Sequence, residues 1–349
     1  MNLLLKKIKI VLKMGKPLFA LRVAVAVANA RLLNKIPPFR QIEIQLTYAC
    51  NLRCTHCSAA SFVEQGNLMS LEDYANIARQ CSEHRVPMVS FTGGEPLLSP
   101  RLEEIIRIFD VRRTLISITT NGTLLTRQRA RALKKAGVDN FVISLDGPDS
   151  FSNDAIRGEG VFEGVMRAIE VCKQEGCAVL AIHTLTHHSV AAGHFDQLIE
   201  LARVLDIPLH VSLASPTGNW ANDQALRKVI LTKNDIDYLN KKQQEHHFLR
   251  RDLDGNYMGR GCPAGTERFV ITPYGDVLPC TKIQASFGNV RQEPMLDIRN
   301  RMTSIPLFAS SPPLCLCAED PTYLAVYLPN TFHRKDFPIP YQDFFTESQ

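Results

Sequence analysis

Strand and helix signals alternate along residues 42–213, and this alternation constrains the fold more than any other feature of the chain. Runs typical of strands occur at 42–47, 87–92, 115–120, 141–145, 179–185 and 208–213. Amphipathic patterns typical of helices lie between them, at 70–84, 100–110, 126–136, 161–176 and 194–206. The alternation predicts an α/β fold with a parallel sheet and right-handed crossovers. Because six units fall short of the eight in a closed barrel, we expect an open, partial (β/α)6 TIM-like barrel.

The predicted strands have one apolar and one polar face. In the first strand, Ile42, Ile44 and Leu46 share one face, while Gln45 and Thr47 share the other. The polar faces of later strands carry Ser90, Thr92, Ser117, Thr119, Asn121, Ser144, Asp146, His210 and Ser212. A parallel sheet packed on both faces is apolar throughout, so a polar inner face predicts a lumen that holds water or a ligand. Ligands of parallel α/β folds bind at the carboxyl ends of the strands, which is where we expect the site.

The segment CNLRCTHC follows the first predicted strand and places Cys50, Cys54 and Cys57 at C-x3-C-x2-C spacing. Ten cysteines in a chain of 349 residues without a secretory pattern favour metal binding or cysteine chemistry over a disulfide framework. Full ligation of a [4Fe-4S] cube takes four cysteines, so three thiolates would leave one iron without a protein ligand. Zinc with a remote fourth ligand is the alternative interpretation.

Three further loops end the second, third and fourth predicted strands at the same edge of the sheet. Their sequences are FTGGEP at 91–96, TTNGTL at 119–124 and ISLDGP at 143–148. The paired glycines allow a backbone to approach a ligand closely, although a tight turn also explains them. Glu95 offers a carboxylate that can accept a hydrogen bond from an amine. Three polar loops beside the cysteine segment indicate one shared site.

Together these motifs resemble the radical S-adenosylmethionine (SAM) superfamily, whose signature is C-x3-C-x2-C followed by a GGE-type loop. The resemblance covers residues 40–215, and it implies that Cys50, Cys54 and Cys57 bind a [4Fe-4S] cluster. It also implies that the amino and carboxylate groups of SAM chelate the fourth iron. His56 stands where the family has an aromatic residue, and this departure leaves the three ligands intact.

The same resemblance implies contacts with SAM and a type of chemistry. It assigns Gly93, Gly94 and Glu95 to the methionyl amine, Asn121 and Ser144 to the neighbourhood of the ribose, and Arg157 to the SAM carboxylate. A surface role for Arg157 is the alternative. In this family one electron cleaves SAM to methionine and a 5′-deoxyadenosyl radical, which abstracts hydrogen from an unactivated C–H bond. The cofactor carries the chemistry, while the protein supplies orientation.

A second set of cysteines lies near the C-terminus and consists of Cys262, Cys280, Cys315 and Cys317. The spacing of Cys262, Gly275 and Cys280 resembles the start of the SPASM/twitch extension, which binds auxiliary Fe–S clusters. Only the C-x-C pair follows, so the resemblance implies the shorter twitch form with one auxiliary [4Fe-4S] cluster. The alternatives are a structural zinc, or a cluster with fewer protein ligands, without Cys317, and an open iron.

These patterns predict a division of the chain into three parts. Residues 37–225 are expected to form the barrel, and residues 226–349 a small α+β domain of the twitch/SPASM type with an aromatic C-terminal tail. The turn-rich segment SPTGNW precedes this boundary. The segment RFVITPYGDVLPC, which follows it, is typical of a hairpin. Residues 1–36 are expected to form a basic N-terminal helix.

Positive charge is concentrated at the N-terminus. Residues 1–42 contain nine Lys or Arg and no acidic residue, which leaves 31 basic and 35 acidic residues in the remainder. The helical spacing that predicts a basic amphipathic helix is that of Lys6, Lys9, Lys13 and Lys16. The slightly acidic remainder, with few aromatic residues, excludes a general role in nucleic-acid binding. Because no stretch of about 20 uninterrupted apolar residues occurs, we expect a cytoplasmic protein. Peripheral contact of residues 1–36 with the inner membrane face is the alternative to their packing on the protein itself.

These inferences predict a radical SAM oxidoreductase that acts on a polar substrate, either a small molecule of the sugar or aminocyclitol type or a peptide side chain. Hydrogen abstraction would lead to oxidation, crosslinking or epimerisation, with an electron from a donor such as flavodoxin or ferredoxin. Alternatives are a peptide maturase with a separate recognition partner, an enzyme of lipid-linked substrates at the membrane, and a non-catalytic Fe–S or zinc scaffold. No catalytic hydrogen donor is identified, because Cys81, Cys172 and Cys177 are predicted to be small buried residues.

Overall fold

The computed structural model describes residues 16–32, 38–62, 66–222, 229–251, 253–254, 261–310 and 312–345. Each predicted strand of the barrel is present within two residues of its expected bounds. The strands are β1 (Gln41–Gln45), β2 (Met88–Thr92), β3 (Leu115–Thr120), β4 (Asn140–Ser144), β5 (Ala178–Leu185) and β6 (Leu209–Leu213). They pair in chain order and all are parallel, as the strand and helix alternation predicts.

Three strands from the C-terminal part of the chain extend this sheet at both edges. They are β7 (Leu249–Arg251), β8 (Arg268–Ile271) and β9 (Val277–Leu278). β7 pairs with β6, β8 pairs in parallel with β1, and β9 pairs antiparallel with β8. In the described part of the chain the sheet therefore has nine strands and remains open between β7 and β9. The predicted hairpin forms, and its first strand lies beside the strand that leads into the cysteine segment.

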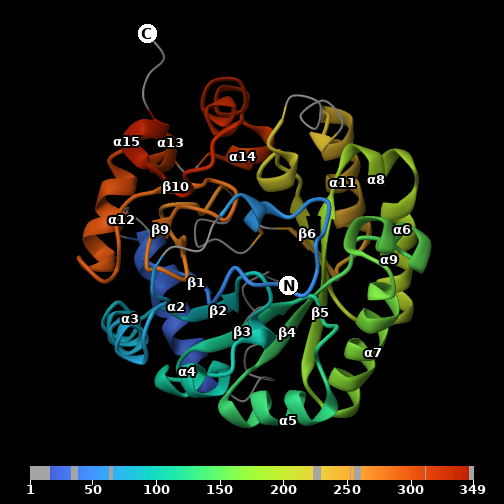
Figure 1. Ribbon diagram of the computed structural model, residues 1–349, viewed down its shortest axis with the longest axis horizontal. Coiled ribbons are helices and arrows are strands. Elements are labelled where there is room, and N and C mark those ends of the chain that lie inside the picture. Colours follow the sequence, from blue (N-terminus) through green and yellow to red (C-terminus); the bar gives the residue numbers. More distant parts are fainter. Residues whose placement is uncertain are drawn as a thin grey trace.

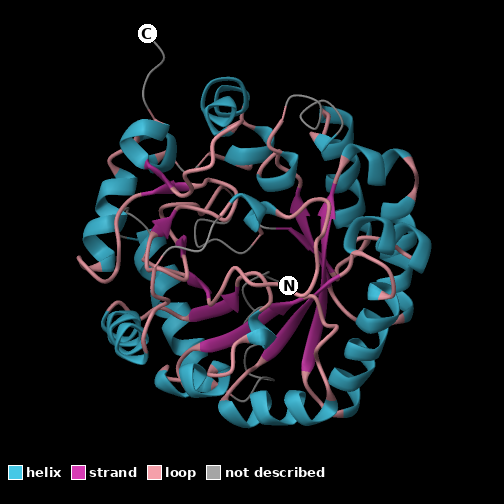
Figure 2. Cartoon of the chain, in the orientation of Figure 1, coloured by secondary structure: helices cyan, strands magenta, loops and turns pink. Residues whose placement is uncertain are grey.

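Helices cover the outside of the curved sheet (Figure 1; Figure 2). Those of the barrel are α3 (Leu71–Glu83), α4 (Leu102–Ile108), α5 (Arg127–Ala136), α6 (Ser150–Arg157), α7 (Val161–Gln174), α8 (His187–Ala191) and α9 (His194–Val204). The sequence analysis does not predict α6 and α8, because both are too short to show a clear helical period. Each begins at a side-chain cap: Asp149 accepts from the Ser152 backbone at the start of α6, and Thr186 accepts from that of Ser189 at the start of α8.

The C-terminal region consists of short helices and a second small sheet. Its α-helices are α11 (Lys233–Glu245), α12 (Met295–Thr303), α13 (Pro306–Ala309), α14 (Leu316–Glu319) and α15 (Tyr341–Phe344). Its small sheet pairs β10 (Ala285–Ser286) with β11 (Ile339–Pro340). The described residues also form the short 3-10 helices η1 (Ser58–Ser61), η2 (Pro96–Leu98), η3 (Gly218–Trp220) and η5 (Leu328–Thr331) and the π-helical turn η4 (Tyr323–Tyr327).

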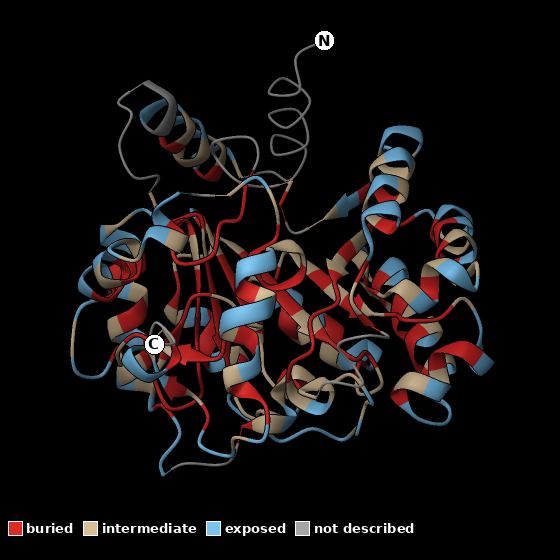
Figure 3. Ribbon diagram, turned by 90° about the horizontal axis from the view of Figure 1, so that it is seen from above, coloured by how far each residue is buried: buried red, intermediate tan, exposed pale blue. Residues whose placement is uncertain are grey.

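The two faces of the sheet differ as their sequence pattern predicts. The apolar residues that face the helices are fully buried, among them Ile42, Phe91 and Ile118. Figure 3 shows these buried strands inside a layer of helices whose outer faces are exposed. On the inner face the hydroxyls of Ser90 and Ser117 lie 2.7 Å apart and form a hydrogen bond. The core therefore lies between the sheet and the helices, and the lumen is polar.

The helix α2 (Pro17–Leu32) packs on the rim of the barrel where the strands begin. The Lys16 ammonium contacts Asp139 Oδ2 at 2.5 Å, and Arg22 Nη1 donates to the Val86 carbonyl at 3.0 Å. The rest of the predicted basic pattern, Lys6, Lys9 and Lys13, lies outside the described residues, so membrane contact by this segment stays a prediction. Among the described helices, none has the length and apolar character needed to cross a bilayer.

Candidate functional site

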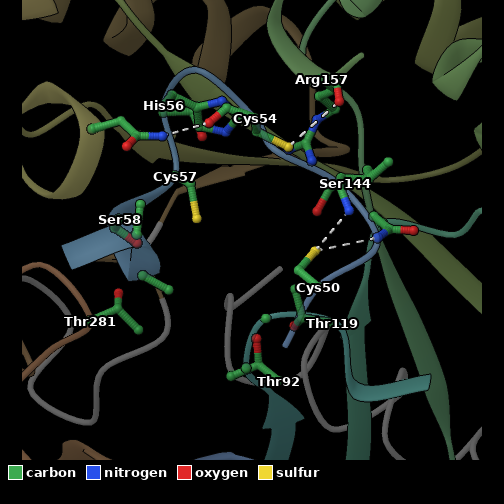
Figure 4. Close-up of a pocket in the computed structure, with 18 of the residues that line it drawn as sticks. Cys50, Cys54, His56, Cys57, Ser58, Thr92, Thr119, Ser144, Arg157 and Thr281 are labelled. Carbon is green, nitrogen blue, oxygen red and sulfur yellow. Dashed lines mark hydrogen bonds between the residues drawn. The ribbon is translucent and has the colours of Figure 1, made fainter. Parts of the chain in front are cut away.

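Cys50, Cys54 and Cys57 border one cavity of about 550 Å³ at the carboxyl ends of the barrel strands. Figure 4 shows their sulfur atoms around the open space. The strands contribute polar side chains to the same cavity, in the order Thr92, Thr119, Ser144, Thr184 and Ser212. A volume of this size is typical of ligand pockets, which span about 300–1,000 Å³. The expected polar lumen is thus a cavity of ligand size beside three thiols.

Hydrogen bonds fix the cysteine loop to elements that are distant in sequence. The Cys54 thiol donates to the Arg157 carbonyl at 3.8 Å, and Asn219 Nδ2 donates to the Cys54 carbonyl at 2.9 Å. Burial raises the pKa of Cys54 to about 11, and it also raises the pKa of Cys50. Ligation of a cluster by these cysteines stays a prediction, and because iron binds thiolates it would release protons from them.

The glycine loop after β2 packs directly on the backbone that leads into the cysteine loop. The Gly94 N–H donates to the Thr47 carbonyl at 2.6 Å. A Cβ atom added at Gly93 would lie 2.4 Å from the Thr47 oxygen, and one added at Gly94 would lie 2.3 Å from the Ala49 oxygen. Gly93 also has φ +144°, which favours glycine. Both glycines border the cavity, and their contact with the SAM amine stays a prediction.

Glu95 is completely buried behind this loop. Its carboxylate accepts hydrogen bonds from Thr120 Oγ1 at 2.7 Å, from the Asn121 N–H at 2.8 Å and from the Leu97 N–H at 3.0 Å. Burial nevertheless raises the pKa of this carboxyl. Asn121 in turn donates to Asn51 of the cysteine loop at 2.9 Å and borders the cavity with Ser144. Glu95 therefore connects the loops after β2 and β3, and its contact with an amine stays a prediction.

Arg157 borders the cavity from the end of α6, but it has a carboxylate partner that the sequence analysis does not predict. Its Nη2 atom lies 2.5 Å from Asp146 Oδ2, and His56 and His183 lie 3.2 and 3.3 Å from the same carboxylate. Burial alone would raise the pKa of Asp146, yet the nearby Arg157 and the histidines hold it well below its usual range. Burial lowers the pKa of His56 to about 4. The contact of Arg157 with the SAM carboxylate stays a prediction.

Asp146 is visible in the sequence as the residue that ends the polar face of the fourth strand. The α6 helix brings Arg157 back to it, and this helix is absent from the predicted elements. His56 reaches the same carboxylate from the cysteine loop and lies 5.6 Å from the Trp220 ring. Position 56, where the radical SAM signature has an aromatic residue, therefore holds an imidazole that lies beside both Asp146 and Trp220.

The four C-terminal cysteines converge on one small pocket beside the barrel, bordered by Cys262, Cys280, Cys315 and Cys317. The sulfur atoms of Cys315 and Cys317 lie 3.6 Å apart. A hydrogen bond from the Cys317 thiol lowers the pKa of Cys280, and the charges of Arg268 and Lys282 act in the same direction. Four thiols in one largely buried pocket are a donor set that fits an Fe–S cluster.

Lys282 connects the two cysteine sites and is a residue that the sequence analysis does not single out. It borders both the lumen cavity and the pocket of the four cysteines. Thr281, next to it in sequence, borders the same open space as Cys57 (Figure 4). No sequence signal marks these two residues except their position directly after Cys280.

Comparison with known proteins agrees with this arrangement. The family model of the radical SAM superfamily matches residues 44–202, and that of the SPASM iron–sulfur cluster-binding domain matches residues 262–319. An AdoMet-dependent heme synthase of Oleidesulfovibrio alaskensis is 31% identical over 287 residues, which cover 73% of this chain and 73% of that protein. Mycofactocin maturase MftC of Mycobacterium tuberculosis is 30% identical over 251 residues, or 68% of this chain and 63% of the maturase. The fold is similar to that of Streptococcus suis SuiB bound to S-adenosylmethionine, with a TM-score of 0.62 and 20% identity over 80% of this chain and 70% of that chain.

The chain belongs to the radical SAM superfamily. It is a radical SAM enzyme with a C-terminal SPASM domain, and the range matched by that domain contains all four C-terminal cysteines. Its cofactors are SAM, a [4Fe-4S] cluster and an auxiliary Fe–S centre. The predictions of family, enzyme class and cofactors are confirmed.

Proposed function

We propose that this enzyme oxidises a polar organic substrate by removing a hydrogen atom and then an electron. One observation carries the proposal. Lys282 lines both the lumen cavity and the pocket of the four C-terminal cysteines, so the two spaces are neighbours. When bound, SAM and the clusters supply a 5′-deoxyadenosyl radical and a nearby one-electron acceptor. A substrate in the lumen would thus lie between the two cysteine sites.

The residues of the chain hold the reactants in a fixed geometry. Gly93, Gly94, Asn121, Ser144 and Arg157 border the cavity and are proposed to contact SAM. Glu95 positions Asn121 from behind the wall. The hydroxyl groups that line the lumen provide hydrogen bonds for a polar substrate, and fixed orientation of this kind lowers the barrier to hydrogen transfer.

The overall reaction is a two-electron oxidation. A substrate C–H bond gives its hydrogen atom to form 5′-deoxyadenosine, and the carbon radical then loses one electron and one proton, which yields a ketone, an alkene or a crosslink. Epimerisation would instead require a hydrogen donor at the cavity. Cys81, Cys172 and Cys177 are buried in the core, and none of them borders the cavity that the described residues form. This favours oxidation.

A radical SAM enzyme requires a one-electron reductant, and we propose a flavodoxin or a ferredoxin in this role. We place a small polar molecule ahead of a peptide as the substrate, because the similarity to the heme synthase spans more of that protein than the similarity to the maturase does. Peptide modification is the second candidate, since a SuiB structure with its precursor peptide SuiA has the same fold over 83% of this chain.

The test uses the full chain after anaerobic reconstitution and compares three proteins. They are the wild type, Cys50→Ala/Cys54→Ala/Cys57→Ala and Cys262→Ala/Cys280→Ala/Cys315→Ala/Cys317→Ala. We expect about eight irons per wild-type chain and about four in each variant. With dithionite and SAM, the wild type and the second variant should release 5′-deoxyadenosine, and the first should not. Failure of the iron-loaded wild type to release it would overturn the proposed reaction.

The oxidation step has its own readout. Carboxylate-bearing tetrapyrroles and short peptides are incubated with the wild type and the second variant, and the products are analysed by mass spectrometry. We expect loss of two hydrogens with the wild type only. Equal product from the variant that lacks the auxiliary cysteines would show that the auxiliary centre is not the electron acceptor. The single variant Cys280→Ser repeats the comparison with a smaller perturbation of folding.

A further inference from the structure

The helix α2 is apolar on more sides than it buries. Its Phe19 and Ala26 are buried. On an adjacent side, Leu18, Leu21 and Val25 follow one another at helical spacing and are 45%, 61% and 38% exposed. A helix that is apolar all round is normally buried, and gathered exposed apolar side chains mark an interaction site. The exposed side of α2 therefore indicates a surface with a partner.

This side of α2 forms one wall of a groove of about 360 Å³. The other wall belongs to the segments that precede β2 and β3, and it includes Arg85 and Arg113. Arg22 of α2 also lines the groove, and its Nη1 atom donates to the Val86 carbonyl at 3.0 Å. The groove thus combines an apolar helix with three guanidinium groups.

The segments beside the groove carry a surplus of positive charge. Residues 84–87 and 110–114 contain three arginines and one acid, namely Arg85, Arg112, Arg113 and Asp110. Asp110 pairs with Arg113 at 3.0 Å, and three arginines against one acid leave a surplus of two charges. Burial lowers the pKa of Arg22, and the charges of Arg113 and Arg85 lower it further against the opposing effect of Asp110. The guanidinium groups are therefore close enough to act together on one anionic partner.

We propose that this face, formed by α2 and residues 84–87 and 110–114 and here termed the α2 surface, binds an anionic phospholipid membrane. Guanidinium groups are well suited to bind lipid phosphates. The exposed apolar side chains of α2 would insert among the lipid chains. An apolar helix face beside basic residues is the combination that holds proteins at a membrane interface.

Two other partners suit the α2 surface less well. A symmetric dimer would place the same residues of two copies opposite each other, and the surplus positive charges would repel. An acidic electron donor would have complementary charge, but it would dock at the amino ends of the strands, whereas the lumen cavity lies at their carboxyl ends. β2 has five residues and β3 has six, so these ends are about 17–20 Å apart. A membrane partner does not require proximity to the cysteine sites.

This mode of docking also defines how the substrate arrives. The bilayer would contact the end of the barrel where the strands begin, and the lumen cavity would lie a strand length away from the lipid. The substrate would therefore enter from water and not from within the bilayer, in agreement with the polar lining of the cavity.

The test measures binding of the full-length, reconstituted enzyme to lipid vesicles by flotation. One vesicle type is phosphatidylcholine alone, and in the other about one third of the lipid is anionic phosphatidylglycerol. We expect binding to the anionic vesicles only, and weaker binding at higher salt concentration. Residues 1–15 also contain four lysines, so variants of the α2 surface decide whether that surface contributes.

The charge of the surface is tested with Arg85→Ser/Arg113→Ser. This variant should bind anionic vesicles about tenfold more weakly, because each basic residue near the membrane attracts anionic lipid. The matched control is Lys233→Ser/Lys241→Ser, which removes two charges from side chains that are 87% and 70% exposed on α11. The control should bind as the wild type does.

The apolar side of the helix is tested with Leu21→Ser. We expect about fivefold weaker binding, because less apolar area enters the lipid. The control is Phe151→Ser, which changes an 88% exposed side chain at the start of α6 and should leave binding unchanged. Iron content after reconstitution, which should be unchanged, shows that each variant is folded. If a surface variant loses iron, Leu18→Ser or Arg85→Ser alone takes its place with the same expectation.

Three results would overturn the proposal. The first is that the wild type does not bind anionic vesicles, or binds both vesicle types equally. The second is that either surface variant binds as tightly as its control, which would assign the binding to other residues. The third is a dimer without lipid that Leu21→Ser dissociates, which would assign the α2 surface to a second copy of the chain.

Discussion

The two cysteine sites of this enzyme differ in how their thiols are presented. Cys50, Cys54 and Cys57 lie on one loop after β1, half-buried or exposed, and face an open cavity. The four auxiliary cysteines come from three segments of the C-terminal region, with Cys315 and Cys317 on the same one, and converge on a small pocket in which all but Cys280 are buried. The first arrangement leaves space for a cosubstrate. The second surrounds its centre with protein, as is suitable for electron transfer rather than for binding a substrate.

The electrostatic surroundings of the two sites differ as well. Burial raises the pKa of Cys54, and the acid near its loop, Asp146, is already paired with Arg157. Beside the auxiliary site, a hydrogen bond from Cys317 and the charges of Arg268 and Lys282 lower the pKa of Cys280. Burial raises the pKa of Cys262 in the same pocket, so Cys280 alone is shifted toward the thiolate there. Because the three cysteines of the first site share one loop, we expect perturbations of that loop to affect cluster loading most.

The largest effect should come from Gly94→Ala. The added Cβ would meet the backbone oxygens of Ala49 and Tyr48 at 2.3 and 2.5 Å, so the cysteine loop must move. We expect iron to fall from about eight to about four per chain and 5′-deoxyadenosine formation to be lost. Iron analysis and product chromatography after reconstitution measure both.

The matched variant in the other region is Gly265→Ala, at φ +70°, where the new Cβ would lie 3.2 Å from the Phe308 ring. It should destabilise the fold by about 1–2 kcal/mol, because the left-handed conformation disfavours a side chain. SAM cleavage should persist. Loss of SAM cleavage in this variant, or full iron content in Gly94→Ala, would contradict the separation of the two regions.

Asp146→Asn should produce the next largest effect. The change leaves the Arg157 guanidinium without its buried partner at 2.5 Å, and loss of one partner of a buried ion pair costs about 3–5 kcal/mol. The measurement is the unfolding free energy in urea under anaerobic conditions. Asp237→Asn is the control, because it breaks an exposed pair with Lys233 and should cost less than about 1 kcal/mol. Similar costs for the two variants would show that the buried pair contributes little.

The same carboxyl predicts a dependence of stability on pH. Its pKa in the folded protein lies below the unfolded value of about 3.9. The stabilisation is therefore complete above the unfolded pKa and is lost as the pH falls through the folded pKa. Below about pH 5 the wild type should lose stability more steeply than Asp146→Asn does. Parallel pH profiles of the unfolding midpoint would contradict this prediction.

A smaller effect than that of Asp146→Asn is expected for Glu95→Gln. The Glu95 carboxylate accepts hydrogen bonds from Thr120, Asn121 and Leu97. The side-chain amide of glutamine would point an N–H group at one of these donors, which should lower the free energy of unfolding by about 1–3 kcal/mol. Since these bonds position Asn121 near the cysteine loop, the affinity for SAM should fall more than the iron content does. Calorimetric titration with SAM measures the affinity, and the exposed Glu83→Gln is the control. Unchanged affinity would assign Glu95 a role in stability alone.

Patterns that extend over a few residues were sufficient to predict the barrel and its main site. Strand and helix periodicity locates β1 to β6, and the three-cysteine segment and the glycine loop lie in the cavity that the polar strand faces predict. The four auxiliary cysteines also converge as their spacing suggests. The short helices α6 and α8 were missed, because five to eight residues show too little of the helical period.

The remaining features depend on contacts between residues that are far apart in sequence. β8 pairs with β1 across more than two hundred residues, Arg157 returns to Asp146 through α6, and Lys282 reaches both cavities. Periodicity and motif spacing describe only neighbours along the chain, so the sequence by itself was enough to predict the six barrel strands, the cysteine motifs and the family to which they belong. Only the tertiary structure decided which distant side chains surround the same buried charge or line the same cavity. The sheet had to curve and the C-terminal segments had to pack on its edges first, because pairing and desolvation energies depend on positions in space.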